Sequence, residues 1–187
     1  MMGALNRSGI PAFYSVHREA TMQHQAKLSG YKGNKHYWEV GPEQYFNRNF
    51  LKTVPGHMCV KVGFRGIPYL SEGVDAKCIL MRRDTEEIER SFKKAFPKGV
   101  FKFEYPYWPL EYLTEYEAAK FHLNRLGYPY IEVWLNELYD SPGWTFERIK
   151  DFVGIDPKEA IKEIDKDMIR CRNYPTRQNE LANSHPG

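Results

Sequence analysis

The sequence predicts an α/β fold in which a mainly parallel sheet is flanked by helices. Three short apolar stretches, at residues 58–62, 77–81 and 130–134, have the length and flanking turn residues of buried strands. Helical patterns lie between them, and strands that alternate with helices form parallel sheets. A chain of 187 residues can bury one substantial core but hardly two. We therefore expect a single domain over residues 1–187.

Composition excludes two broad classes of protein. Apolar residues make up 42% of the chain and aromatic residues 15%, which is too many for a disordered polymer. No apolar run approaches the roughly 18 residues of a membrane-spanning helix. The first residues are apolar for only about five positions, against the roughly 7 to 15 that a signal peptide needs. We expect a cytoplasmic protein without a membrane partner.

The three cysteines do not form a metal-binding or disulfide pattern. Cys59, Cys78 and Cys171 are odd in number, far apart and without CxxC or His-paired spacing. Neither a zinc site nor a disulfide framework is expected, and Cys59 and Cys78 are interpreted as buried thiols in strands.

Charge is distributed unevenly along the chain. Residues 1–100 contain 16 basic and 9 acidic side chains, whereas residues 101–187 contain 11 and 15. The first half would favour an anionic ligand, although a solvated face explains the same bias.

Helix signals are clearest after residue 84. Asp84 followed by Glu87 is a capping pattern, and apolar residues recur at every fourth position from Ile88, which predicts a helix over residues 85–96. Further helices are predicted over 113–126 and 145–153, and another begins at Asp156, where Pro157 suits the first helical position. Residues 15–53 are predicted to form loops and short helices of a binding face, and the aromatic residues 101–110 a loop packed on the core.

The segment from residue 77 to residue 92 carries most functional information. A buried strand ends in Arg82 and Arg83, turns at Asp84 and enters a helix that contains Ser91. In parallel α/β sheets, ligands bind beyond the carboxyl ends of the strands. The planar fork of an arginine and a nearby serine hydroxyl could together hold one phosphate.

This segment resembles the sulfotransferases that use 3′-phosphoadenosine 5′-phosphosulfate (PAPS), which have a P-loop-type nucleotide fold. In that family an arginine and a serine eight residues later hold the 3′-phosphate of the donor, and Arg83 and Ser91 have this spacing. Residues 131–138 and 141–155 are similar to the family's following strand, turn and final helix, and residues 161–172 to the tail of bacterial and phage-like members. Residues 1–11, 17–20 and 30–39 resemble the family's first helix and the loop after it.

Two departures from the family pattern stand out. The Gly-rich loop that holds the 5′-phosphosulfate, and the central strand before it, would lie just ahead of Met1, and no GxxxxGK[ST] occurs elsewhere in the chain. We therefore expect an N-terminally truncated domain: either a fragment, or a domain with a rearranged sheet in which the flanking strands face each other or a gap. Leu135 replaces the tyrosine that is usual in the turn after the last strand.

The resemblance implies transfer of a sulfuryl group from PAPS to a hydroxyl or amine of a small molecule or glycan, without a metal. Lys61 lies in the strand that resembles the family's "KTH" strand and would stabilise charge, but the family's histidine is missing after it. A base must take the proton of the acceptor. The candidate bases lie in the loop-rich segment: His17, Glu19, His36 and Glu39.

Other interpretations remain open for the same residues. Arg83 could be an ion-paired helix terminus beside an ordinary helical Ser91, and Lys61 an ordinary lysine at a strand end. The whole chain could be a non-catalytic remnant that binds a nucleotide or a protein partner, or could self-associate through an uncovered sheet edge. No recognised motif supports nucleic-acid binding.

Overall fold

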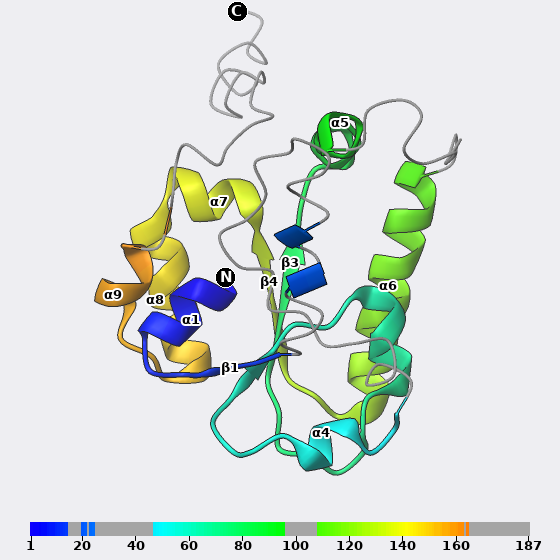
Figure 1. Ribbon diagram of the computed structural model, residues 1–187, viewed down its shortest axis with the longest axis vertical. Helices are drawn as coiled ribbons and strands as arrows, with labels where there is room; N and C mark the ends of the chain where they lie inside the picture. The colour runs from blue at the N-terminus through cyan, green and yellow to red at the C-terminus, as the bar shows by residue number, and fades with distance from the viewer. Residues whose placement is uncertain (15–19, 22, 25–46, 96–107, 163, 165–187) are drawn as a thin grey trace, which may run out of the picture.

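Two pairs of parallel strands form the centre of the molecule, with helices on both sides (Figure 1). The computed structural model describes residues 1–14, 20–21, 23–24, 47–95, 108–162 and 164; the side chains of residues 91–95, 108–110 and 157 are outside this description. The predicted α/β class is confirmed. Most of the loop-rich segment 15–53 and the whole of 101–107 lie outside the described residues.

The three predicted strands are present, and β1 is a further strand that was not predicted. β1 (Ala12–Phe13) pairs with β2 (Cys59–Val60), and β3 (Cys78–Arg82) pairs with β4 (Tyr130–Trp134). β4 has the predicted bounds, β3 begins and ends one residue later than predicted, and β2 is shorter, with Lys61 as a single bridging residue after it.

The predicted parallel direction of the strands is confirmed, but they form two small sheets where a mainly parallel sheet was predicted. Within the described residues β1–β2 and β3–β4 are two separate two-stranded sheets, because no strand is hydrogen-bonded to both β2 and β3. The two pairs nevertheless share one apolar layer. Cys59 of β2 and Ile79 of β3 pack against one hydrophobic core. Leu80 of β3 is part of a second hydrophobic core, and Cys78 packs against it.

The two cores lie on opposite faces of the β3–β4 pair. Side chains alternate along a strand, so Ile79 and Met81 face one side and Leu80 the other. The first core consists of Ala4, Leu5, Val133, Leu138, Phe146, Ile149, Ile155 and Ala160. The second core consists of Ile67, Leu80, Tyr116, Ala119, Leu123 and Tyr128.

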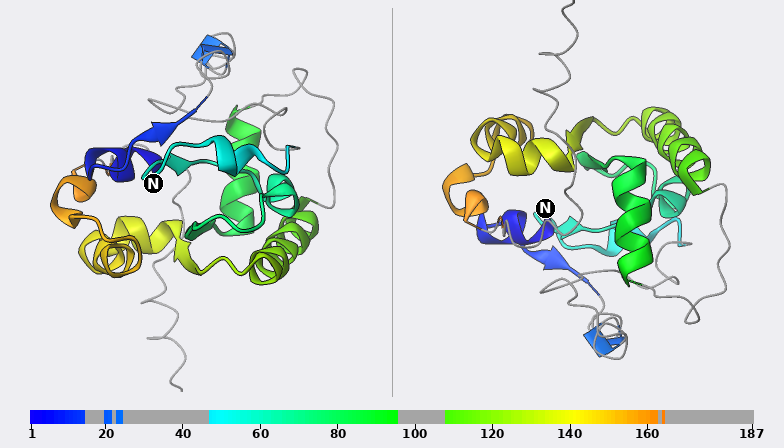
Figure 2. Two further views of the ribbon diagram at one scale, coloured as in Figure 1. Left: turned by 90° about the horizontal axis from the view of Figure 1, so that it is seen from below. Right: turned by 90° about the horizontal axis from the view of Figure 1, so that it is seen from above.

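Helices cover both faces of the strands (Figure 2). The first core is covered by α1 (Met2–Arg7), α7 (Leu135–Asp140), α8 (Pro142–Val153) and α9 (Pro157–Ile161), and the second by α6 (Trp108–Leu126) and the 3₁₀ helix η1 (Phe64–Tyr69). α5 (Thr85–Ala95) follows the carboxyl end of β3, and α4 (Phe50–Thr53) lies at the opposite end of the molecule (Figure 1). None of the helices in the described ranges is long and apolar enough to cross a membrane.

Predicted caps begin two of these helices. Asp84 Oδ1 accepts hydrogen bonds from the backbone N–H groups of Glu86 at 2.9 Å and Glu87 at 3.3 Å. Asp156 Oδ1 accepts one from the N–H of Lys158 at 3.0 Å. Each bond satisfies a donor at a helix start that has no partner within the helix, so both capping predictions are confirmed.

Two helices begin earlier than predicted, and neither α7 nor the 3₁₀ helix η1 was predicted. α6 begins at Trp108 instead of residue 113, and α8 at Pro142 instead of residue 145. Proline is compatible with the first helical turn, where its missing N–H has no intrahelical role. The prediction of a loop over 101–110 is therefore wrong for its last three residues. The six residues of α7 stand where only a turn was expected.

Replacing Gly154 with alanine should destabilise the protein by about 1 kcal/mol, because Gly154 ends α8 with a φ of +77°. No neighbouring atom lies within 4 Å of the added methyl group, so the cost is purely conformational. Gly143 is the matched control: it lies in the same helix, has equal space and has no positive φ. Gly143→Ala should be neutral or slightly stabilising in urea unfolding, and equal losses from both variants would contradict the left-handed cap.

Candidate functional site

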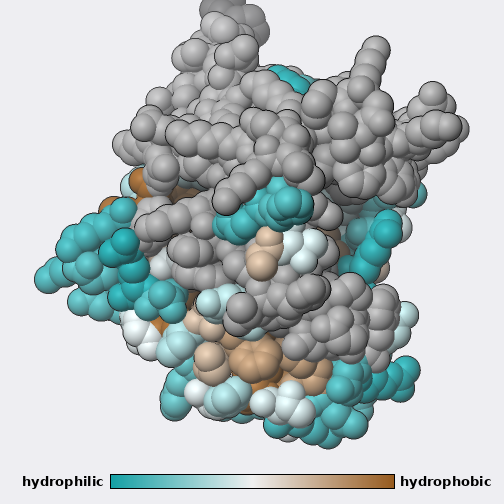
Figure 3. Space-filling view, in the orientation of Figure 1, coloured by the Kyte–Doolittle hydropathy of each residue, from teal (hydrophilic) through white to brown (hydrophobic). Residues whose placement is uncertain are grey.

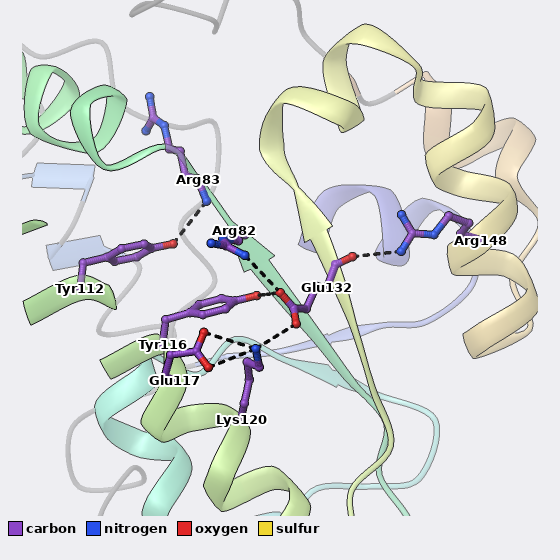
Figure 4. Close-up of polar contacts among 8 residues, drawn as sticks. All are labelled: Arg82, Arg83, Tyr112, Tyr116, Glu117, Lys120, Glu132 and Arg148. Atoms are coloured by element: carbon purple, nitrogen blue, oxygen red, sulfur yellow. Dashed lines mark hydrogen bonds and ion pairs between the residues drawn. The ribbon is translucent and has the colours of Figure 1, made fainter. Parts of the chain in front are cut away.

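The carboxyl ends of β3 and β4 gather most of the charged and aromatic contacts of the molecule (Figure 4). β3 ends at Arg82, which lies directly opposite Trp134 in the register of the pair. Arg83 follows at the turn into α5. Because the strands are parallel, both carboxyl ends lie at one edge, where α/β proteins bind their ligands.

Arg82 is held between two aromatic rings and a carboxylate. Its guanidinium carbon lies 4.2 Å from the ring centroid of Trp134 and 5.3 Å from that of Tyr116. Its Nη1 is 3.6 Å from Glu132 Oε2. Each stacking contact contributes on the order of 0.5–2 kcal/mol when partly desolvated. These contacts give Arg82 a structural role, and they leave its guanidinium little freedom to reach a ligand.

Glu132 is the centre of this cluster. Its Oε2 accepts a hydrogen bond from the hydroxyl of Tyr116 at 2.6 Å, and its Oε1 is 3.3 Å from Lys120 Nζ. Tyr116 and Lys120 are both on α6, so the carboxylate joins that helix to β4. Lys120 also pairs with Glu117, at 3.2 Å.

The pKa values in the cluster follow from these contacts. The hydrogen bond from Tyr116 lowers the pKa of Glu132, against an opposing effect of burial, and Lys120 and Arg82 lower it further. Burial raises the pKa of Tyr116, and its hydrogen bond to Glu132 raises it further. A carboxylate with a lowered pKa accepts a proton poorly at neutral pH, so Glu132 is unsuited to act as a general base.

Arg83 is in a different environment from Arg82. Its backbone N–H donates to the hydroxyl of Tyr112 at 3.3 Å, and its Nε lies 3.5 Å from Oε2 of the buried Glu87. Figure 4 shows the side chains of Arg82 and Arg83 pointing away from each other. The side chain of Arg83 is 27% exposed. The long contact between Arg83 and Glu87 is an ion pair at a helix start. Such a pair is what the alternative interpretation, in which Arg83 has only a structural role, predicts.

The other predicted site residues are only partly placed. Ser91 is in α5, one helical turn beyond Glu87, but its side chain is outside the described residues. Lys61 directly follows β2, the strand that pairs with β1, and is not part of the β3–β4 pair. All four candidate bases, His17, Glu19, His36 and Glu39, lie outside the described residues.

Arg148 supports the outer side of β4. Its Nη2 donates to the backbone oxygen of Glu132 at 3.2 Å, and its Nη1 is 3.5 Å from Glu137 Oε2. Its guanidinium also lies 4.6 Å from the ring centroid of Trp144. These contacts fix α8 and α7 against the end of β4.

The Glu132 cluster was not predicted from the sequence. A signal was present, because Glu132 is a charged residue inside an otherwise apolar strand, and such a group needs partners. The partners Tyr116 and Lys120 could not be named from the sequence, since the register of α6 against β4 depends on the fold.

The cysteines and acidic groups do not suggest metal or thiol chemistry. In the described part of the chain, no three His, Cys, Asp or Glu side chains gather as metal ligands. Cys59 and Cys78 are in strands, as predicted, but are only partly buried. Burial raises the pKa of both thiols to about 11, so little reactive thiolate exists at neutral pH. Cys171 is outside the described residues.

Among the described residues at this edge, Arg83 is the cation best suited to bind a ligand. Arg82 and Lys120 are neutralised by Glu132 and packed on rings, whereas Arg83 has a partly exposed guanidinium held by a single long contact. Such a group can bind an anion that approaches α5 from the solvent.

Comparison of the chain with protein-family models, curated proteins and solved structures finds no match.

Proposed function

We propose that this chain is a sulfotransferase-like domain that binds the adenosine 3′,5′-bisphosphate part of PAPS at the carboxyl end of β3. The observation that carries the proposal is the order of the segment: a parallel strand, then Arg83, an Asp84-capped helix, and Ser91 in that helix. Arg83 and Ser91 would bind the 3′-phosphate. Arg83 would turn from Glu87 towards the phosphate, which accepts two parallel hydrogen bonds from a guanidinium.

The separation of the two strand pairs supports the same proposal. The family resemblance expects a further strand between the flanking strands, and within the described residues no strand joins β2 to β3. β2 and β3 belong to separate pairs, yet Cys59 of β2 and Ile79 of β3 pack against the same core.

The proposed reaction moves a sulfuryl group in line from donor to acceptor. The hydroxyl oxygen or amine nitrogen of a small molecule or glycan attacks sulfur, and the bond from sulfur to the 5′-phosphate oxygen breaks. Adenosine 3′,5′-bisphosphate leaves with the electron pair, and a base takes the proton of the acceptor. Lys61 would stabilise the charge that develops on the leaving phosphate, and the base would be one of the four candidates outside the described residues.

Calorimetric titration with adenosine 3′,5′-bisphosphate tests the binding half of this proposal. Replacing Arg83 with alanine should weaken binding by about ten- to a hundredfold, which corresponds to the loss of a hydrogen-bonded charge contact. Arg65 provides the matched control, since it is a 71% exposed arginine paired with Glu115, and Arg65→Ala should bind as the unaltered chain does. Equal affinity of the Arg83 and Arg65 variants would refute the assignment of Arg83.

The rival function is a non-catalytic remnant that acts through a protein partner. The Arg83–Glu87 ion pair favours it, because an arginine already neutralised by a buried carboxylate needs no phosphate. Replacing Glu87 with glutamine separates the two functions. It frees Arg83 and should tighten bisphosphate binding by a few-fold if Arg83 is a ligand, and should change nothing if the chain does not bind nucleotide.

A further inference from the structure

A basic groove lies at the end of the molecule opposite to the Arg83 site. α4, η1 and the last turn of α6 form its walls, and its cavity volume is about 240 Å³. In Figure 1, α4 is at the lower end of the molecule, while β3 leads upward into α5. Hydrophilic residues gather along the same lower margin in the space-filling view, next to a smaller apolar area (Figure 3).

Three cations face one carboxylate in this groove. Arg48 and Lys52 come from the region of α4, and Arg125 comes from α6. Glu72 pairs with Arg125 at 3.3 Å, but the two side chains are 76% and 45% exposed, and such a pair contributes little. Among the described residues, no carboxylate pairs with Arg48 or Lys52. The groove therefore has an excess of positive charge.

The walls of the groove are fixed to one another through Ser71, the neighbour of Glu72. Ser71 is buried, with 1% of its surface exposed. Its Oγ accepts a hydrogen bond from the backbone N–H of Leu51 in α4 at 3.2 Å, and its carbonyl oxygen accepts one from the hydroxyl of Tyr128. The cations consequently project from a framework that is already ordered, which lowers the entropic cost of binding.

The size and chemistry of the groove restrict its ligand. The groove, at about 240 Å³, is slightly smaller than the range of about 300–1,000 Å³ that is typical of sites for drug-sized molecules, which favours a small ligand. Two guanidinium groups and one ammonium are donors only, and guanidinium forks match the oxygen spacing of phosphate and sulfate. Pro68 and Leu70 add a small apolar lining to the groove.

We propose that this groove binds a single tetrahedral oxyanion, phosphate or sulfate, through Arg48, Lys52 and Arg125. The anion displaces Glu72 from Arg125 and is bound as the free ion or as the terminal group of a small molecule. The site is separate from Arg83 and does not depend on the function proposed for that residue.

Titration of the full-length chain with inorganic phosphate, at constant ionic strength set with chloride, tests the site. The Arg83→Ala background removes the other proposed phosphate ligand. Lys52→Gln and Arg125→Gln should each weaken binding by about three- to tenfold, because each removes one exposed charge-assisted contact. Glu72→Gln should tighten binding about twofold or more, since it removes the competing carboxylate.

Lys158→Gln is the matched control, because Lys158 is an exposed lysine of α9 outside this groove. It should leave phosphate affinity unchanged. A phosphomonoester such as glycerol 3-phosphate, and sulfate, are titrated in parallel: tighter binding of the monoester identifies a terminal group as the ligand, and equal binding identifies the free ion. Absence of saturable binding, or an equal loss in Lys52→Gln and Lys158→Gln, would overturn the proposal.

Discussion

Replacing Phe146 with alanine is expected to destabilise the folded protein by about 3–5 kcal/mol. Phe146 is on α8 with 0% of its surface exposed, and it belongs to the first core with Val133 of β4 and Ile149 of the same helix. Removing the ring loses its transfer free energy and leaves a cavity that tightly packed neighbours fill only in part. Urea unfolding monitored by circular dichroism measures the change as a shift in midpoint at constant slope.

Phe121 is the matched control for this prediction. It is also a helical phenylalanine, but 65% of its surface is exposed on α6, where it contacts the ring of His122. Phe121→Ala should change the free energy of unfolding by no more than about 0.5 kcal/mol. Similar losses for the two variants would mean that α8 does not pack on the strands as described.

Replacing Glu132 with alanine is expected to cost about 1–3 kcal/mol of stability. The substitution leaves the buried Tyr116 hydroxyl without its acceptor and leaves Arg82 and Lys120 without their shared counter-ion. The cost is below that of a fully buried ion pair, because the side chains of Arg82 and Glu132 are each 30% exposed. Glu117→Ala is the control: Glu117 contacts the same lysine, but its side chain is 64% exposed, and its loss should cost less than about 1 kcal/mol.

The pKa of Glu132 gives this cluster a pH dependence. The folded state lowers the pKa of Glu132 below its value in the unfolded chain, where the carboxyl group takes up its proton more readily. Its contribution is therefore complete above the unfolded pKa and is lost as the pH falls through the folded pKa. Between pH 7 and pH 3 the unaltered chain should lose more stability than Glu132→Gln, and parallel curves for the two proteins would contradict the assigned direction.

Elements were predictable from the sequence where local chemistry determines them. The apolar run of β4 is bounded by turn residues, Asp84 and Asp156 carry their own capping oxygens, and Gly154 ends α8 in a conformation that glycine tolerates best. Each of these signals acts within a few residues, so it can be recognised in the sequence without knowledge of the fold. α6 was predicted too short because an aromatic, proline-containing start was interpreted as a loop, although proline fits the first turn.

The candidate site was predictable only in part, because its contacts join residues far apart in the chain. The position of Arg83 after a parallel strand followed from the order of elements, and it carried the functional hypothesis. Its pairing with Glu87 follows a helical spacing of four residues and was anticipated only as a general alternative. The Tyr116–Glu132 bond spans 16 residues and two elements, and the split of the sheet depends on which strands pair. Neither is encoded in a local pattern.

The direct test of a nucleotide site at the carboxyl end of β3 is the ratio of affinities of the unaltered chain for adenosine 3′,5′-bisphosphate and for 5′-AMP. The two ligands differ only in the 3′-phosphate that Arg83 and Ser91 are proposed to hold. Binding of the bisphosphate at least about tenfold tighter, in calorimetry at fixed ionic strength, is the expected result. Equal affinities, or no binding of either nucleotide, would contradict the proposal and favour the non-catalytic remnant.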